Sequence, residues 1–245
     1  MKEKIYTIPI NDAFDTECAC PICEIERKID LQLVESTLGA SMMEADYRII
    51  TNERGFCKTH YAGLIMQSKA LPLSLIMQTH SEFQNKKIIS MLQSNPDAKK
   101  SLFKKTSSKK QVAENIINAV NNLNNSCAIC EKTNNIMTKF LENIIFLWKT
   151  ENEFRDKFNS KKGFCLPHFA KLLEYAVKGL NENDFNLFLE RISSIQISSL
   201  NEIYNDVSQF AKLFDHRSSG MPSIKVKTAV KRSIHTYSGL MLQND

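Results

Sequence analysis

Apolar residues recur along most of this chain at steps of three and four residues, the spacing of one buried face of an α-helix. From Ile22 to Leu38 they are interspersed with charged residues in this way. The same spacing predicts helices over His60 to Met66 and over Leu73 to Leu92, with a short helix around Tyr47. Ile5 to Phe14 is expected to form an extended arm.

The second half of the chain repeats this order of elements. Helices are predicted over Gln111 to Leu123, over the apolar stripe from Ile136 to Trp148, and over Glu151 to Phe158. Another helix carries His168, and at least one long helix lies within Phe185 to Phe214. Seven glycines and six prolines in 245 residues are too few for a turn-rich all-β protein, so an all-α protein is expected.

The repeated order predicts two related helical halves, each long enough to bury a core. The expected boundaries are 1–94 for the first half, a polar linker over 95–110, 111–214 for the second half, and a C-terminal basic tail over 215–245. The run from Lys104 to Lys110 is interpreted as a solvated connector, with a phosphate-binding patch as the alternative.

A pair of cysteine motifs occurs once in each half. Cys20-Pro21-Ile22-Cys23 is followed by Gly55-Phe56-Cys57-Lys58-Thr59-His60. Cys127-Ala128-Ile129-Cys130 is followed by Gly163-Phe164-Cys165-Leu166-Pro167-His168. The separation between the two motifs differs by only one residue between the copies, which indicates an internal duplication.

Each copy supplies three thiols and one imidazole, the donor set of a closed tetrahedral zinc site. A Cys-x-x-Cys at a helix start places its sulfurs where free N–H groups and the helix dipole favour thiolates. Two helices of about a dozen residues can return the chain to its starting point, so one Zn²⁺ is expected in each half. The two predicted sets are Cys20, Cys23, Cys57 and His60, and Cys127, Cys130, Cys165 and His168.

Two other chemistries use similar residues. An iron–sulfur cluster is one alternative, although such clusters usually take four cysteines. Thiol redox chemistry is the other, because a Cys-x-x-Cys before a helix is also the dithiol arrangement of oxidoreductases. Disulfides among the three cysteines of one copy of the motifs would leave one of them unpaired.

Several further residues lie near these motifs or outside the repeat. Glu24 and Glu131 follow the second cysteine of each Cys-x-x-Cys, and each either lies in the first helical turn or accepts the outer N–H of a ligand histidine; the first-turn role is favoured. Cys18 is expected to be a free thiol, with an alternate ligand or a redox switch as the alternative. The remaining histidines are interpreted as packed or solvent-facing: His80, His216 and His235.

The bulk properties favour a cytoplasmic protein without membrane attachment. The N-terminus has no secretory pattern, and the longest apolar stretches, such as Ile144 to Trp148, are too short to span a bilayer. Clustered cysteines in the reducing cytosol are typical of metal ligands. Two zinc ions on three thiolates each would lower the formal charge of +5 to about +3, which is weak support for a polyanionic partner.

The chain resembles an uncharacterised bacterial family that is described only as a domain of unknown function. The resemblance rests on the paired motifs, on Leu73 to His80, and on the tail with Phe214 to Arg217, Pro222 and Lys231 to Ile234. It covers nearly the whole chain. The resemblance implies an architecture and no activity.

No Ser-His-Asp set, glycine-rich phosphate loop or acidic metal motif occurs, so the sequence favours a non-enzymatic interaction or regulatory module with two structural zinc sites and a protein partner. A nucleic-acid-binding regulator is one alternative, supported by the lysine-rich run and by basic residues of the tail. A thiol-based redox sensor that releases its metal on oxidation is another, with Cys18 beside Cys20 as its distinctive feature. The basic tail residues are Lys225, Lys227, Lys231 and Arg232.

Overall fold

The computed structural model describes residues 4–94, 109–214 and 223–241, and within these ranges it contains helices and no strand. The prediction of an all-α protein is therefore confirmed for this part of the chain. Two compact units are present. Unit 1 comprises Met1–Lys28 and Ile136–Asp245, and unit 2 comprises Ile29–Asn135.

The boundaries between the units fall inside two helices, α2 (Pro21–Thr37) and α7 (Ala128–Thr150). Unit 1 therefore joins the start of the chain to its last part, whereas the predicted halves follow the chain in order. Most of the predicted linker and the first residues of the predicted tail, including His216, lie outside the described residues.

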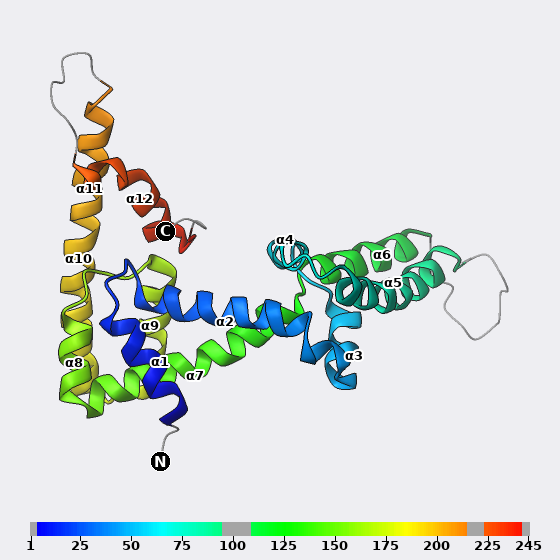
Figure 1. The fold of residues 1–245 in the computed structure, drawn as a ribbon, viewed down its shortest axis with the longest axis horizontal. Helices are drawn as coiled ribbons and strands as arrows, with labels where there is room; N and C mark the ends of the chain where they lie inside the picture. The colour runs from blue at the N-terminus through cyan, green and yellow to red at the C-terminus, as the bar shows by residue number, and fades with distance from the viewer. Residues whose placement is uncertain (1–3, 95–108, 215–222, 242–245) are drawn as a thin grey trace. The chain divides into compact units, whose positions relative to one another are not determined.

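Unit 1 is built around the long helix α10 (Figure 1). Helices α8, α9, α11 and α12 all contact α10. The last two come from the predicted basic tail, which is thus partly helical. With parts of α2 and α7, unit 1 consists of the helices α1 (Lys4–Asp15), α8 (Asn152–Asn159), α9 (Leu166–Gly179), α10 (Glu182–Lys212), α11 (Ile224–Lys227) and α12 (Ala229–Ser238).

The core of unit 1 is a cluster of phenylalanines, each at most 2% exposed. The ring centroid of Phe158 lies 5.7 Å from that of Phe14, 5.2 Å from that of Phe164 and 5.5 Å from that of Phe188. Phe154 packs on Phe14 at 4.9 Å. Because Phe164 immediately precedes Cys165, this core also holds the second Gly-Phe-Cys turn in place.

The extended arm predicted for Ile5 to Phe14 is wrong, since these residues form helix α1 despite Pro9. Proline costs an internal helix one hydrogen bond and strains the preceding turn. The buried residues Ile10, Ala13 and Phe14 follow helical spacing, and α1 packs against α8. Burial of this apolar face outweighs the cost of the proline.

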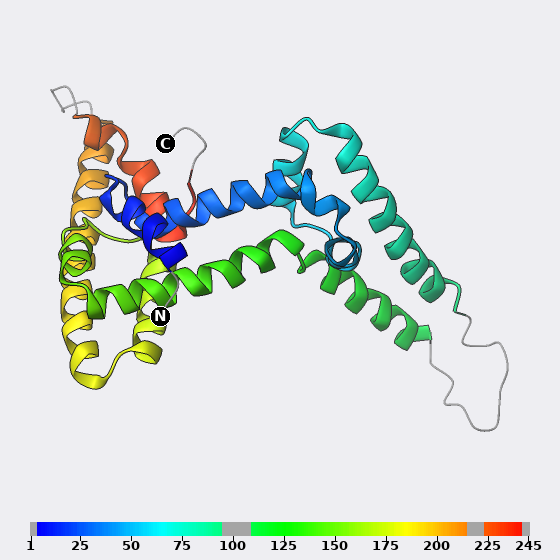
Figure 2. The same ribbon diagram turned by 60° about the horizontal axis from the view of Figure 1, so that its bottom comes forward.

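Unit 2 is organised around two long helices, α5 and α6, which lie side by side in antiparallel directions (Figure 2). Helix α3 packs on α5, and α6 leads towards the start of α7. The predicted helices over Leu73 to Leu92 and Gln111 to Leu123 are confirmed, each with slightly longer bounds. The elements of unit 2 are η1 (Ala40–Met43), α3 (Ala45–Arg54), α4 (Lys58–Met66), α5 (Ala70–Leu92) and α6 (Lys109–Asn124), with parts of α2 and α7.

Truncation of Phe158 tests the aromatic core. Phe158→Ala removes a fully buried ring at the centre of the cluster and is expected to destabilise unit 1 by about 3–5 kcal/mol. Leu187→Ala on α10 is the control, because Leu187 is 61% exposed and its truncation should cost little. Urea unfolding followed by circular dichroism measures both variants, and equal stability of the two would contradict this description of the core.

Candidate metal centres

The structure gathers the eight predicted cysteine and histidine ligands into two groups of four, and in each group the donor atoms lie within 4.8 Å of one another. Site 1 belongs to unit 1, and site 2 belongs to unit 2. Site 1 consists of Cys20, Cys23, Cys165 and His168, and site 2 of Cys57, His60, Cys127 and Cys130.

The pairing within each half that the sequence predicts is wrong. Each site takes its Cys-x-x-Cys from one copy of the repeat and its Cys-x-x-His from the other. In unit 1, the aromatic core holds Phe164 against Phe158, which also packs on Phe14 just upstream of Cys20. In unit 2, the backbone N–H of Ala128 donates to the carbonyl of Gly55 at 3.0 Å, which fixes the second Cys-x-x-Cys beside the first Gly-Phe-Cys turn.

Two helices begin at each site. Cys20 and Cys165 stand directly before α2 and α9, and Cys57 and Cys127 stand directly before α4 and α7. The carbonyl oxygen of each of these four cysteines accepts the first hydrogen bond of its helix, at 2.8–3.3 Å. The prediction that both Cys-x-x-Cys motifs lie at helix starts is therefore confirmed. Each set of thiols faces two positive helix ends, which favour the thiolate form.

The distances between donor atoms fit a tetrahedral zinc ion. A Zn–S distance of about 2.3 Å places two sulfurs on a tetrahedron about 3.8 Å apart, and a sulfur and a nitrogen slightly closer. The Cys23 and Cys165 Sγ atoms of site 1 lie 3.5 Å apart, and the Cys57 and Cys130 Sγ atoms of site 2 lie 3.7 Å apart. In both sites the histidine Nδ1 lies 3.2–3.7 Å from the sulfurs. Both donor sets therefore suit zinc.

Each site histidine turns its second nitrogen towards a carboxylate. His168 Nε2 lies 3.3 Å from Glu26 Oε2, and His60 Nε2 lies 2.7 Å from Asp30 Oδ1. Asp30 also accepts from the hydroxyl of Thr133 at 3.3 Å. A carboxylate at this position fixes the ring so that Nδ1 faces the metal, and it raises the basicity of the ligand.

Glu26 and Asp30 contact the two site histidines, and the sequence analysis does not identify them. Glu24 and Glu131 lie in the first turns of α2 and α7, as favoured from the sequence, and they pair with arginines, Arg27 and Arg54. The sequence signal that could have identified Glu26 and Asp30 is their position, about one and two helical turns after the first Cys-x-x-Cys.

Hydrogen bonds between the donors and to the nearby carboxylates shift the pKa values of both site histidines. Burial alone lowers the pKa of His60, but hydrogen bonds to Asp30 and Cys127 raise it to about 10. Burial likewise opposes protonation of His168, whereas hydrogen bonds to Cys20 and Glu26 raise its pKa to about 9. A protonated imidazole does not bind metal, so zinc must displace this proton at neutral pH.

The pKa values of the site thiols are also shifted by burial and by hydrogen bonds between the donors. Hydrogen bonds from Cys20 and Cys23 lower the pKa of Cys165 to about 4. Burial raises the pKa of Cys127, but the hydrogen bond to His60 and the backbone N–H bonds of Cys130 and Cys57 together outweigh it, and the pKa falls to about 6. The Cys165 hydrogen bond raises the pKa of Cys23. A zinc ion bound here would complete the deprotonation of the ligands, and its affinity would fall as the pH is lowered.

The first Gly-Phe-Cys turn is held by two residues of α5. Gly55 has a φ of 59°, and a Cβ atom there would lie 2.8 Å from the His80 ring. The buried His80 donates from Nδ1 to the carbonyls of Thr51 and Asn52, and Gln84 donates to the carbonyls of Asn52 and Glu53. These bonds satisfy the open carbonyls at the end of α3. His80 is thus a packed histidine that positions the turn before Cys57.

In the second turn, a single buried side chain has a similar role. Gln196 of α10 accepts from the Phe164 N–H at 3.2 Å and donates to the Phe164 carbonyl at 3.0 Å. A Cβ atom at Gly163 would lie 2.3 Å from Ser199 Oγ, so a glycine is needed for this close approach to α10. The first turn is therefore fixed by the long helix α5, and the second by the long helix α10.

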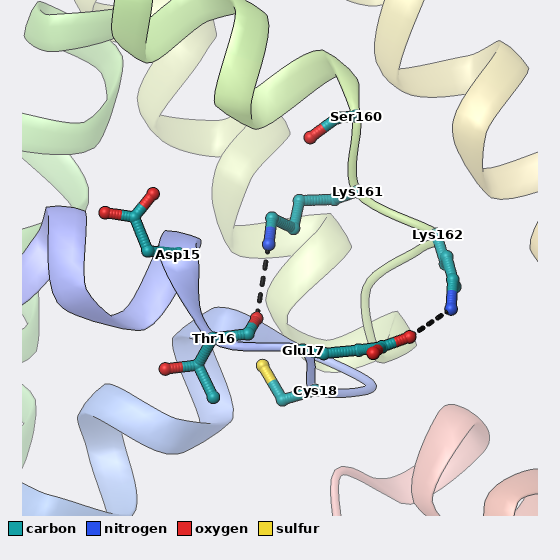
Figure 3. A pocket seen from close by; sticks show the side chains of 7 residues that line it. All are labelled: Asp15, Thr16, Glu17, Cys18, Ser160, Lys161 and Lys162. Atoms are coloured by element: carbon teal, nitrogen blue, oxygen red, sulfur yellow. Dashed lines mark hydrogen bonds and ion pairs between the residues drawn. The ribbon is translucent and has the colours of Figure 1, made fainter.

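Cys18 belongs to neither site. Figure 3 shows it in an open pocket with Glu17, Lys161 and Lys162, where Lys161 donates to the Thr16 carbonyl and Lys162 pairs with Glu17. Burial raises the pKa of the Cys18 thiol, and the nearby Cys20 raises it further. The structure agrees with a free thiol at this position.

His235 is brought to site 1 from the far end of the chain. Its Nε2 lies 3.3 Å from Cys23 Sγ, and the two residues are separated by 212 positions. The ring is buried on α12. This contact is the second feature of the sites that sequence spacing does not reveal.

A family described as a family of unknown function, DUF6062, matches residues 1–244. The chain belongs to the DUF6062 family. No curated protein and no solved structure matches this DUF6062 chain. Among its described residues, no helix is both long and apolar enough to cross a lipid bilayer.

Replacement of Cys57 tests the exchanged pairing. With Cys57→Ser, the metal of site 2 should be lost, so that Cys127 and Cys130 react with N-ethylmaleimide while Cys20, Cys23 and Cys165 stay protected. Mass spectrometry of the labelled peptides gives the result. Labelling of Cys20 and Cys23 would instead show that Cys57 shares a site with them, as the sequence predicts. Cys18→Ser is the control and should leave the metal content unchanged.

Proposed function

We propose that this DUF6062 chain is a zinc-binding, non-enzymatic protein-interaction module of the cytoplasm, with a structural zinc ion in each site. The main support is that each site offers four donors at tetrahedral spacing. Four protein ligands leave no open position for substrate or water, in contrast to catalytic zinc sites. The thiol-rich donor sets suit a reducing compartment.

The positions of the ligands along the chain support a structural role. Site 1 joins Cys23 to Cys165, which are 142 residues apart, and site 2 joins Cys57 to Cys130, which are 73 residues apart. A metal that links segments so distant contributes its binding free energy to folding. Three sulfurs and one nitrogen also favour zinc over an iron–sulfur cluster, which usually takes four cysteines.

The α5 and α6 pair supports a protein partner. Helix α6 has no buried residue, although it carries an apolar stripe. Leu92 is 63% exposed and Ile117 is 56% exposed, and further apolar residues of both helices are also exposed. Exposed apolar side chains gathered on two adjacent helices are typical of a protein-binding surface.

The basic tail gives less support to nucleic-acid binding than its sequence suggests. Arg232 pairs with Asp206 at 2.5 Å, and both Arg232 and Lys225 pair with Glu202 on α10. Charges engaged in this way are partly neutralised before any phosphate approaches. Most of the run from Lys104 to Lys110 lies outside the described residues.

Metal content tests the zinc assignment. Protein purified without added metal should carry close to two zinc ions per chain by plasma mass spectrometry, with no visible absorbance. Removal of zinc by a strong chelator should lower the helical circular dichroism and the unfolding temperature, because both ions link distant segments. Bound iron with a brown absorbance would overturn the assignment, as would a fold and stability that chelation leaves unchanged.

Photo-crosslinking tests the interaction surface. A benzophenone amino acid in place of Ile117 should yield a discrete crosslink to another protein in cells, because this exposed position lies on α6. The same residue in place of Leu187, which is 61% exposed on α10, is the matched control and should not yield that product. A crosslink from Ile117 to nucleic acid, or identical products from both positions, would contradict the proposal.

A further inference from the structure

The two sites differ in how far they are shielded from solvent. All four donors of site 1 are buried, with Cys20 2%, Cys23 3%, Cys165 1% and His168 2% exposed. In site 2 only Cys127 and His60 are buried, while Cys57 and Cys130 are partly exposed. Their two sulfurs lie 3.7 Å apart, so the two partly exposed residues share one edge of the expected zinc tetrahedron.

Helix α12 lies against site 1. Its His235 lies 3.3 Å from Cys23 Sγ through Nε2, and the helix packs on α9 and α10. The helix ends at Gly239, whose φ is 72°, and a Cβ atom there would lie 3.5 Å from Cys165 Sγ. The last turn of α12 and the residue after it therefore lie against two of the three sulfurs of site 1.

When the Cys23 thiolate binds zinc, the His235 Nε2–H would donate a hydrogen bond to it. An N–H donated to a metal-bound thiolate draws electron density from it and makes it less reactive towards protons and incoming ligands. The partly exposed Cys57 and Cys130 can instead be approached from solvent. Replacement of a zinc ligand requires such access, because the incoming donor binds before the thiolate has fully left.

We propose that site 2 is an exchangeable zinc site, which transfers its ion to an external thiol or nitrogen donor, whereas site 1 retains its ion beneath α12. This inference rests on the zinc assignment made above, and it makes the structural role of the site 2 ion reversible. The exchange transfers Zn²⁺ without oxidation or reduction. The released cysteines take up protons, and the acceptor loses protons as it binds the ion.

The rates of zinc release test this difference. The zinc-loaded full chain is mixed with excess 4-(2-pyridylazo)resorcinol, which absorbs visible light when it binds zinc. Two phases of one equivalent each are expected, with rates that differ by at least about tenfold, equivalent to about 1.4 kcal/mol in activation free energy. Release of both ions in one phase would overturn the proposal. A chain purified without zinc would instead refute the zinc assignment itself.

Alkylation identifies which site empties first. N-ethylmaleimide added at the end of the fast phase should label Cys57, Cys127 and Cys130, while Cys20, Cys23 and Cys165 remain protected. The opposite labelling would overturn the proposal even if release has two phases. Cys18 is the internal reference, because it belongs to neither site.

Substitutions at His235 test the role of α12. His235→Ala should accelerate the slow phase at least about threefold and leave the fast phase unchanged, whereas His235→Gln retains an N–H donor and should have a smaller effect. Tyr237→Ala, at an exposed position of the same helix, is the matched control. If His235→Ala impairs folding, the labelling of the unaltered chain still decides between the sites. Equal slow phases in His235→Ala and the unaltered chain would refute the shielding role of His235.

Discussion

The meeting of two helix N-termini at each cysteine cluster is the constraint on which the rest of the structure depends. A helix N-terminus carries about half a positive elementary charge. Two N-termini that meet at one site therefore carry about one positive charge between them and repel each other. Zinc on three thiolates and a neutral imidazole carries a net charge of −1. The expected metal set would therefore balance the helix ends that meet there, and it explains why Cys20, Cys57, Cys127 and Cys165 each stand directly before a helix.

Sequence distance alone does not decide which motifs combine. A pairing within the first half would join Cys23 to Cys57, whereas the structure joins Cys23 to Cys165 across 142 residues. The entropy of loop closure rises by only about 0.6 kcal/mol per doubling of length, so the longer loop costs roughly 1 kcal/mol more. Burial of a single phenylalanine contributes about 1.5–3 kcal/mol, and Phe158 and Phe164 lie in the core that holds Cys165. The free energy gained by packing these phenylalanines therefore exceeds the extra entropic cost of closing the longer loop.

Local patterns predict what local interactions determine. The helical spacing from Ile22 and the glycine before each Phe-Cys turn predict elements that the structure contains, because neighbouring residues specify them. Helix α1 was not predictable in this way, since its stability comes from packing on α8 despite Pro9. Asp30 and His235 could not be assigned either, because their roles follow from which motifs meet and from a contact across 212 residues.

Residues at corresponding positions of the two Cys-x-x-Cys motifs make different contacts. Glu26 and Thr133 each lie three residues after the second cysteine, yet Glu26 contacts His168 directly while Thr133 donates to Asp30, which contacts His60. A carboxylate beside a zinc set of charge −1 leaves excess negative charge, which is costly where water is excluded. In the buried site 1, Lys171 lies 3.7 Å from Glu26, and His235 offers a donor to Cys23. The two carboxylates are equally exposed, Glu26 by 35% and Asp30 by 34%, so the sites differ at their cysteines: those of site 1 are buried and have a histidine and a lysine nearby, whereas Cys57 and Cys130 of site 2 are partly exposed.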